Sequence, residues 1–483
     1  MNKILLTALV LVVLITTVYA GGKEESEEKV TVESYLHYNP TEWTVRTAEH
    51  PNVARVILTL AEEFTEMYPN IEITFTDIPR MAGPEYETWL TTQVLAGTAP
   101  DLVSADSTLM AKGWALPIGE YLDQPNPFIK GNERWRDAFY PNFMESLRYV
   151  DGLEYCAPIR AIYPAMTIGL VYNKDYIREN NIPVPTNWAE LKEVSKLLKD
   201  TGTGLSPWPR DAYLGNVWAL PMQILPPLLQ GLAPEMDLNG DGLIDVQEGL
   251  EAYEKGLIGV RTPIYETAIN EALALNETMI EGFSTSDVGA MFKQGGLFLQ
   301  YQGAWDFSRY QNDPAIDFEL GFLPAFFVTP DDVPGAHPPM EMTRGGGEVP
   351  VEHMVATEGP DHIILKDSVE SRGNLEEVLL WWQFLTTPEN AGLLVNENQQ
   401  FISAVKGAPL GSLWQDVANF QLPIYEYSFS WDGMGLQWDM AYRTTWFELL
   451  LARTLGIISY DEMIDQWEEA WDEGVERFKA TLD

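Results

Sequence analysis

The fold class of this 483-residue chain is decided near its N-terminus, where three segments read KVTVESY (29–35), VARVILTLAEEFTEM (53–67) and IEITF (71–75). In the first and third segments, apolar residues alternate with polar ones, which is the period of a half-buried strand. In the second segment, apolar residues recur every three or four positions, which is the period of an amphipathic helix. This order predicts a β-α-β unit with parallel strands and a right-handed crossover.

The pattern continues with a helix over 86–95, a turn over 97–100 and a third strand at 102–103. Ligands of such sheets bind beyond the carboxyl ends of the strands. We therefore expect the loops 37–51, 78–85 and 104–108 to face one crevice.

A second α/β unit is predicted from Ala161 onward. Its first helix should be capped by Thr186 or Asn187, since both side chains can accept a hydrogen bond from a helix N-terminus. We find no internal repeat and no low-complexity linker, so one body of interleaved segments is expected. Its expected strands are 168–172, 297–301 and 320–327, and its expected helices are 188–198, 265–282, 286–294, 375–385 and 438–482.

The composition excludes several classes of protein. Hydrophobic residues make up 46% of the chain, which is enough for packed cores and excludes global disorder. The 30 Lys and Arg residues face 72 Asp and Glu residues, a formal net charge of −42. Such a surface repels phosphate backbones and anionic lipids, so we expect no nucleic-acid partner.

The first twenty residues have the pattern of a signal peptide. Lys3 precedes an apolar run over 4–18, and small residues stand at Val18 and Ala20. The alternative is a membrane anchor, but a helix of that length spans only ~22 Å at ~1.5 Å per residue, and a bilayer core needs roughly 30 Å. We predict cleavage after Ala20 and a periplasmic protein without a lipid anchor, since the only cysteine is Cys156. Cys156 is expected to be a buried, inert thiol.

The most specific local motif is DLNGDGLIDVQE at 237–248. Oxygen-bearing side chains stand at positions 1, 3, 5, 9 and 12 and a glycine at position 6, which is the spacing of a twelve-residue calcium loop. A structural Ca²⁺ is the predicted cofactor, and an Asx-rich surface turn is the alternative. No full helix is expected to enter this loop. The expected ligands are Asp237, Asn239, Asp241, Asp245 and Glu248 through their side chains and Leu243 through its carbonyl.

Sequence motifs of enzymes are largely missing. The chain has no G-x-S-x-G, H-E-x-x-H, P-loop or G-x-G-x-x-G motif, and its five histidines show no metal-ligand spacing. Paired carboxylates of a glycosidase stay possible, because 72 acidic residues make such pairs frequent. Several of the sixteen tryptophans stand in polar or glycine-rich loops, where an indole ring can stack on a sugar. These are Trp43, Trp208, Trp305 and Trp431.

Four motifs follow one another along the chain: AGTAPDLV at 96–103, GLVYNKD at 169–175 with PTNWAEL at 185–191, MFKQG at 291–295 with GAW at 303–305, and FLTTPE at 384–389. They resemble the motifs of the family-1, maltose-binding type of extracellular solute-binding proteins. The order and spacing cover the mature chain. The calcium-like loop, the long 328–350 loop and the absent lipid cysteine depart from the family pattern.

The resemblance implies a two-lobed, type II periplasmic-binding-protein fold of class α/β. Each lobe would hold a β-α-β sheet flanked by helices, and the C-terminal region would be helical. Residues 29–160 and 320–375 would form lobe 1, and residues 161–319 and 376–483 would form lobe 2.

The resemblance also implies a monomer without catalytic activity that binds a sugar or oligosaccharide and delivers it to the permease subunits of an ABC importer. The alternative is a secreted carbohydrate-active enzyme of the glycoside hydrolase type. The expected ligand-binding residues are Tyr38, Asn39, Trp43, Ser104, Asp106, Arg160, Tyr163, Tyr213, Asn216, Trp218, Trp305, Gly346, Trp431, Trp438 and Arg443.

Overall fold

The structure is a computed structural model. It describes residues 29–47, 49–50, 52–78, 83–105, 109–110, 112–147, 149, 151–161, 168–207, 217–344, 356–357, 361–398, 402–411 and 421–482. The predicted signal peptide lies outside these ranges. Among the helices that are described, none is both long and apolar enough to cross a membrane.

The first sheet has the strand order β12-β3-β1-β2. β1 pairs in parallel with both β2 and β3, which confirms the β-α-β unit predicted at the N-terminus. β12 comes from far along the chain and runs antiparallel to β3, with His362 opposite Ser104. The bounds are β1 (Val30–Tyr35), β2 (Ile71–Phe75), β3 (Leu102–Ser104) and β12 (His362–Ile364).

Both faces of the first sheet are buried, because neighbouring residues of a strand point to opposite sides. Leu102 packs into the large core of the molecule, where α2 (Val56–Met67) contributes Phe64. Val103 packs into a smaller core on the other face, where α3 (Gly83–Ala96) contributes Leu90. The sheet is therefore the middle layer of an α/β sandwich.

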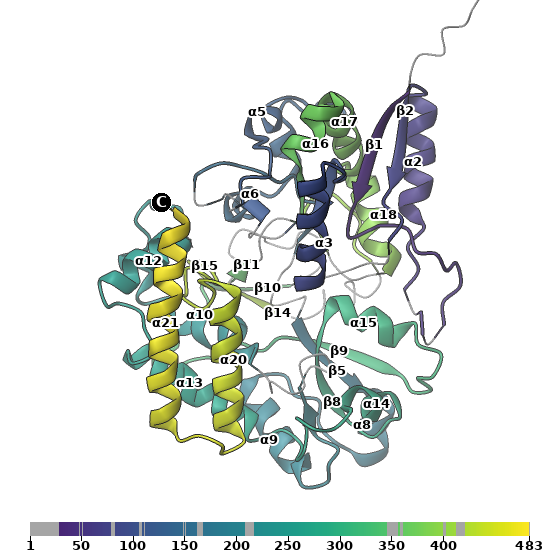
Figure 1. Ribbon diagram of the computed structural model, residues 1–483. Helices are drawn as coiled ribbons and strands as arrows, with labels where there is room; N and C mark the ends of the chain where they lie inside the picture. Colours follow the sequence, from purple (N-terminus) through teal and green to yellow (C-terminus); the bar gives the residue numbers. More distant parts are fainter. Residues whose placement is uncertain are drawn as a thin grey trace, which may run out of the picture.

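The second sheet has the strand order β6-β8-β5-β9 and lies below the first in Figure 1. β6 and β8 are parallel and joined through helices, while β5 runs antiparallel to both of its neighbours, so this sheet is mixed. The bounds are β5 (Ile168–Asn173), β6 (Leu205–Ser206), β8 (Leu299–Gly303) and β9 (Leu320–Pro324).

The predicted division of the chain between the two sheets is wrong at two places. β9 was expected in the first half, but its backbone pairs with β5, with Val171 opposite Phe322. The segment after residue 376 was expected in the second half, but α17 (Leu375–Leu385) packs on α2, where the rings of Trp381 and Phe64 are 5.2 Å apart. Both elements were predicted correctly, but their places in the fold were not. The local pattern of residues does not determine which sheet a strand pairs with or which helix another helix packs on.

Other helices surround the two sheets (Figure 1). Of the two predicted capping residues of α9, Asn187 is the one that caps the helix, since its Oδ1 accepts from the Glu190 amide at 2.9 Å. Near the first sheet lie α5 (Gly119–Leu122), α6 (Pro141–Ser146), α16 (Lys366–Arg372) and α18 (Pro388–Asn398). The short helix η1 (Trp135–Ala138) contacts α5 and α6. The others are α8 (Lys174–Asn180), α9 (Trp188–Lys199), η3 (Leu220–Ile224), α10 (Leu225–Leu229), α11 (Ala233–Met236), α12 (Val246–Glu254), α13 (Pro263–Asn276), α14 (Val288–Lys293), α15 (Ala304–Gln311), α20 (Met440–Thr454) and α21 (Tyr460–Leu482).

Three small sheets complete the fold. β10 pairs with β14, β4 pairs with β13, and β15 lies between β11 and β7. β10 falls within the stretch 328–350 that was expected to be a loop. The bounds are β4 (Arg160–Ala161), β7 (Leu243–Ile244), β10 (Glu341–Arg344), β11 (Ala356–Thr357), β13 (Ile402–Ser403), β14 (Gln421–Ile424) and β15 (Ser428–Ser430).

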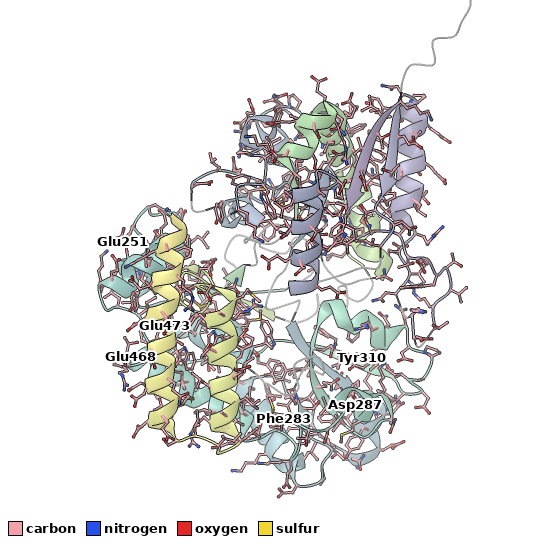
Figure 2. The ribbon with its side chains drawn as sticks, in the orientation of Figure 1. Glu251, Phe283, Asp287, Tyr310, Glu468 and Glu473 are labelled. Atoms are coloured by element: carbon pink, nitrogen blue, oxygen red, sulfur yellow. The ribbon has the colours of Figure 1, made fainter. Side chains whose placement is uncertain are left out.

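Part of the excess of acidic residues lies on the outer surface of the helices α12 and α21 (Figure 2). Figure 2 shows Glu468 and Glu473 along α21, with Glu251 of α12 near its upper end. Each forms an exposed ion pair, and that of Glu468 with Arg261 measures 2.8 Å. Exposed pairs contribute little to stability, so the surface charge acts mainly on solubility and on the choice of partners.

Candidate functional site

The loop after β1 holds three of the predicted site residues, and the structure assigns them different surroundings. Asn39 is a loop-stabilising residue, because its Oδ1 accepts from the Leu36 amide (2.8 Å) and its Nδ2 donates to the Thr76 carbonyl (3.3 Å). Tyr38 is buried, and its ring centre lies 6.0 Å from that of His362.

Trp43 is the exposed tryptophan of the same loop. Its ring stacks on His50 with centres 4.1 Å apart, and its Nε1 donates to the Asn52 carbonyl at 2.6 Å. One face of the indole ring is therefore covered, which leaves one face for any ligand.

Ser104 ends β3 at the carboxyl edge of the first sheet, where a ligand of a parallel sheet is expected. Its side chain is buried, and its Oγ has no hydrogen-bond partner among the residues that the structure describes. A buried hydroxyl without a partner is uncommon, so this position fits a group that a ligand completes.

Next to Ser104 lies a group of polar residues that we call the first-sheet cluster: His37, Cys156, Arg160, Asp361 and His362. Asp361 is buried and accepts from the backbone amides of Ile159 and Arg160, both at 3.2 Å. Its Oδ1 lies 3.1 Å from Nδ1 of His362 and 3.3 Å from Sγ of Cys156. Arg160 donates from Nη2 to Nε2 of His37 at 2.9 Å. The cluster connects β1, the segment that leads into β4, and β12.

The charges of the first-sheet cluster support one another. Burial alone would raise the pKa of Asp361, but His362 and Arg160 outweigh it and hold that pKa below its usual value. Burial raises the pKa of the Cys156 thiol, as expected for an inert cysteine. Only Arg160 of this cluster was predicted as a site residue. Asp361 and His362 were missed, because a single Asp-His pair in a strand has no distinctive spacing.

A second group, the aromatic cluster, consists of Trp218, Trp431, Asp432, Arg443 and Phe447. The rings of Trp218 and Trp431 are 5.2 Å apart, and Phe447 of α20 lies 5.4 Å from Trp218. Arg443 of α20 lies over the Phe447 ring at 6.0 Å and donates to Gln437 at 2.8 Å. The structure thus brings together three residues that the sequence analysis selected: Trp218, Trp431 and Arg443.

Trp438 does not belong to the aromatic cluster. Its side chain is buried, and its ring packs at 5.7 Å from Phe478 of the C-terminal helix α21. Trp438 therefore packs in the core between α20 and α21, and its binding role stays a prediction.

Tyr149 connects the side of the first sheet with the aromatic cluster. It packs against the smaller core of the first sheet, and its ring lies 6.1 Å from that of Tyr155. Burial raises the pKa of Tyr149, and the charges of Asp151 and Asp432 raise it further. Asp432 of the aromatic cluster is therefore close enough to Tyr149 for their charges to interact.

Other predicted site residues lie outside the described part of the chain: Asp106, Tyr163, Tyr213, Asn216 and Gly346. Trp305 belongs to the first turn of α15, and its side chain lies outside the described part as well. The binding roles of these six residues stay predictions.

The calcium-like loop has the expected backbone. Gly242, at position 6, has a positive φ of 82°, β7 and α12 follow it, and the preceding helix α11 has only four residues, as predicted. Its side chains bond to the loop itself, since Asp237 accepts from the Gly240 amide (2.8 Å) and Glu248 from the Leu238 amide (2.6 Å). Within the described residues, no three Asp, Glu, His or Cys side chains are grouped as metal ligands would be.

Comparison with known proteins identifies the family. Residues 50–392 match the model of the bacterial extracellular solute-binding proteins. The chain belongs to this family. Membership in an extracellular family implies an exported protein.

One relative is the maltotriose-binding protein of Pyrococcus abyssi (strain GE5 / Orsay), which is 30% identical over 170 residues. The match covers 34% of this chain and spans about a third, 32%, of that relative.

Solved structures of the family share the fold. RafE, which is known from Streptococcus pneumoniae, was solved in complex with raffinose and matches with a TM-score of 0.57 and 16% identity over 92% of this chain and 100% of its own. The GacH receptor of Streptomyces glaucescens GLA.O matches with a TM-score of 0.57 and 16% identity over 93% and 99%. The predicted two-lobed, type II α/β fold is therefore confirmed.

Proposed function

We propose that this solute-binding protein captures a sugar or oligosaccharide between its two α/β halves. The observation that carries the proposal is the aromatic cluster, in which Trp218 lies against both Trp431 and Phe447 and the Arg443 guanidinium lies over the Phe447 ring. Indole rings offer the apolar surface on which a pyranose stacks, and charged groups beside them hydrogen-bond to its hydroxyls.

Relatives support the choice of ligand class. The proteins similar to this chain carry the names of maltotriose, raffinose and acarbose as ligands. All three are oligosaccharides or close analogues, and all are rich in hydroxyl groups. A neutral oligosaccharide is therefore our proposed ligand.

We infer further that this protein acts as a monomer and hands its ligand to the permease subunits of an ABC importer. Closure of the two halves on the sugar would bury it and create the shape that the permease recognises. Such a shift requires that the ligand bind the closed form more tightly, and hence that both halves supply contacts. Ser104 and the aromatic cluster are the proposed sources of those contacts.

The test is a thermal-shift screen of the purified protein with galactose, raffinose, maltotriose, acarbose and chitotriose. A ligand at a hundred times its Kd adds about 2.7 kcal/mol of stability, which raises the melting temperature by several degrees. Chromatography of the ligand after overnight incubation should recover it unchanged. Absence of any shift would contradict the proposal, and hydrolysed ligand would favour the alternative of a glycoside hydrolase.

For export, we propose that the first twenty residues are a signal peptide that is cleaved after Ala20. The sequence pattern described above is the support for this cleavage site. N-terminal sequencing of the protein from its native envelope should begin at Gly21. An intact Met1 would contradict the proposal.

For the loop 237–248, we propose that it binds one Ca²⁺ of structural function. The oxygen-bearing residues stand at the calcium-loop positions, and Glu248 would have to turn from the loop amides toward the ion. With the Kd of ~10⁻⁴ to 10⁻³ M that is typical of extracellular modules, 5 mM Ca²⁺ should stabilise the protein by ~1 to 2 kcal/mol. The Glu248→Gln variant should lose this shift, and an equal shift in both proteins would refute the site.

A further inference from the structure

Asp432 of the aromatic cluster was not among the predicted site residues. It belongs to a tight turn between β15 and α20. In this turn the Leu436 amide donates to the Trp431 carbonyl (2.9 Å), and the Gly435 amide donates to the Asp432 carbonyl (2.7 Å). These hydrogen bonds fix the backbone on both sides of Asp432, which directly follows Trp431 in the sequence.

The turn is also seated closely on the end of the calcium-like loop. A Cβ atom on Gly433 would lie 2.1 Å from the Ile244 carbonyl oxygen, and one on Gly249 of α12 would lie 2.6 Å from the Cα of Gly433. No side chain fits in either place, so the two backbones meet directly. This close packing limits where the Asp432 carboxylate can lie.

The carboxylate of Asp432 lacks the partner that a buried acceptor requires. Its Oδ1 is inaccessible to solvent and accepts no hydrogen bond within the part of the chain that the structure describes. Arg443 interacts with it by charge and also donates a hydrogen bond to Gln437. A buried acceptor that stays unsatisfied costs stability, so such a group in a native protein requires an explanation, and a ligand that completes it is one such explanation.

We propose that Asp432 is a specificity-determining residue of the carbohydrate site, whose carboxylate accepts hydrogen bonds from ligand hydroxyl groups while the sugar ring stacks on the neighbouring indoles. This inference rests on the proposed function. Hydrogen bonds to an ionised acceptor are about twice as strong as neutral ones, so a hydroxyl at this position contributes strongly to the choice of sugar. A site built to bond a hydroxyl rejects the analogue that lacks it, because the carboxylate is then left unsatisfied.

The pH dependence of binding follows from the surroundings of Asp432. Burial raises its pKa to about 7, although the charge of Arg443 lowers it. The other titratable groups that face the turn are Tyr149 from the first-sheet side and, from the start of α12, Asp245 and Glu248, whose carboxylates accept from backbone amides. Since the ionised form accepts ligand hydroxyls, affinity should be highest above pH 7. It should fall by up to tenfold for each pH unit below 7.

The experiment is titration calorimetry at pH 5.5, 7.0 and 8.5 with the sugar of the screening panel that gives the largest thermal shift. The variant Asp432→Asn keeps the size of the side chain and removes its charge. Its control is Asp200→Asn, an exposed aspartate at the end of α9. We expect the parent and the control to lose at least tenfold in affinity from pH 8.5 to 5.5. Asp432→Asn should bind at least tenfold more weakly at pH 8.5, with an affinity that does not change with pH.

The outcomes separate this inference from the proposed function. If the parent binds a sugar and Asp432→Asn binds it equally well with the same pH profile, Asp432 has no such role. If the parent's affinity is constant from pH 5.5 to 8.5, the inference is overturned even if the variant does not fold. If the parent binds no sugar of the panel, the proposed function fails and the role of Asp432 fails with it.

Discussion

The first-sheet cluster and the aromatic cluster differ in how many partners their carboxylates have. In the first, the buried carboxylate of Asp361 contacts two backbone amides, a histidine and a thiol. In the second, the carboxylate of Asp432 has an oxygen without a donor among the described residues, and Asp432 directly follows Trp431, whose ring lies tilted at 5.2 Å from that of Trp218. Both oxygens of the Asp361 carboxylate have partners within the protein, whereas Oδ1 of Asp432 has none among the described residues.

This difference indicates that the two clusters have different roles. A satisfied polar network stabilises one arrangement of the chain. Removal of any member leaves its former partners buried without a hydrogen bond, which lowers the stability of the fold. An unsatisfied acceptor beside an apolar surface is costly until a ligand arrives. We therefore expect the first-sheet cluster to act mainly on the architecture near β4, and we propose the aromatic cluster as the part that acts in recognition.

The largest expected effect is on stability, at Asp361. Replacement by alanine in Asp361→Ala leaves the amides of Ile159 and Arg160 without their acceptor and removes the carboxylate that lies 3.1 Å from Nδ1 of His362. Each buried donor that is left without its acceptor costs about 1 to 3 kcal/mol, so the two amides together should cost about 2 to 6 kcal/mol. Urea denaturation should report this loss, while Asp200→Asn should change the free energy of unfolding by less than ~0.5 kcal/mol. A loss below ~1 kcal/mol at Asp361 would mean that the cluster is not a structural network.

The next effect is on affinity, at Trp431. The Trp431→Ala variant removes one of two adjacent indoles and should cost ~2 kcal/mol or more, about thirtyfold in Kd. The matched control is Trp438→Phe, since Trp438 packs on Phe478 in the core and should affect stability but not sugar binding. Calorimetry of both variants measures the contrast. Equal affinities in the two variants would remove the aromatic cluster from the binding site.

A smaller effect is expected at Gly249 of α12, which contacts the turn that holds Asp432. A methyl group in Gly249→Ala would lie 2.7 Å from the Asp432 carbonyl and must displace the turn. Such overpacking costs about 1 to 3 kcal/mol. The thermal melt should show the loss, and the affinity for sugar should fall at the same time because Trp431 and Asp432 move. An unchanged affinity in a destabilised variant would separate this contact from recognition.

The smallest effect concerns pH and the stability of the unliganded protein. The pKa of Asp361 is depressed, so its contribution to stability is present above the pKa of the unfolded chain and is lost as pH falls through the folded pKa. The pKa of Asp432 is raised to about 7, so its contribution is present at low pH and is lost as pH rises through 7. The free energy of unfolding of Asp432→Asn should therefore rise by ~1 kcal/mol relative to that of the parent between pH 5 and pH 8. The expected gain is this small because Asp432 is partly exposed to water. A variant that is less stable than the parent at pH 8 would contradict this sign.

The sequence predicted the elements of this fold well, because their patterns are local. β1, α2 and β2 follow from the period of their apolar residues, and the cap of α9 from Asn187 beside Trp188. The sheet that β9 joins was predicted wrongly, because its pairing with β5 joins residues that are 147 to 155 positions apart in the chain.

The candidate site was predicted less well for the same reason. Trp218, Trp431 and Arg443 were found by residue type and family resemblance, but Trp438 has the same chemistry and lies in the core. Asp432 could not be distinguished among 72 acidic residues. What singles it out is an unpaired buried oxygen, which only the folded chain reveals.

The central claim is that one sugar is held by both halves of the molecule, which close on it. Small-angle X-ray scattering of the mature protein, with and without a saturating amount of the best sugar of the panel, tests this claim most directly. We expect the radius of gyration to fall on binding, because hinge closure brings the two halves together. A radius of gyration that stays the same at full saturation would contradict the account.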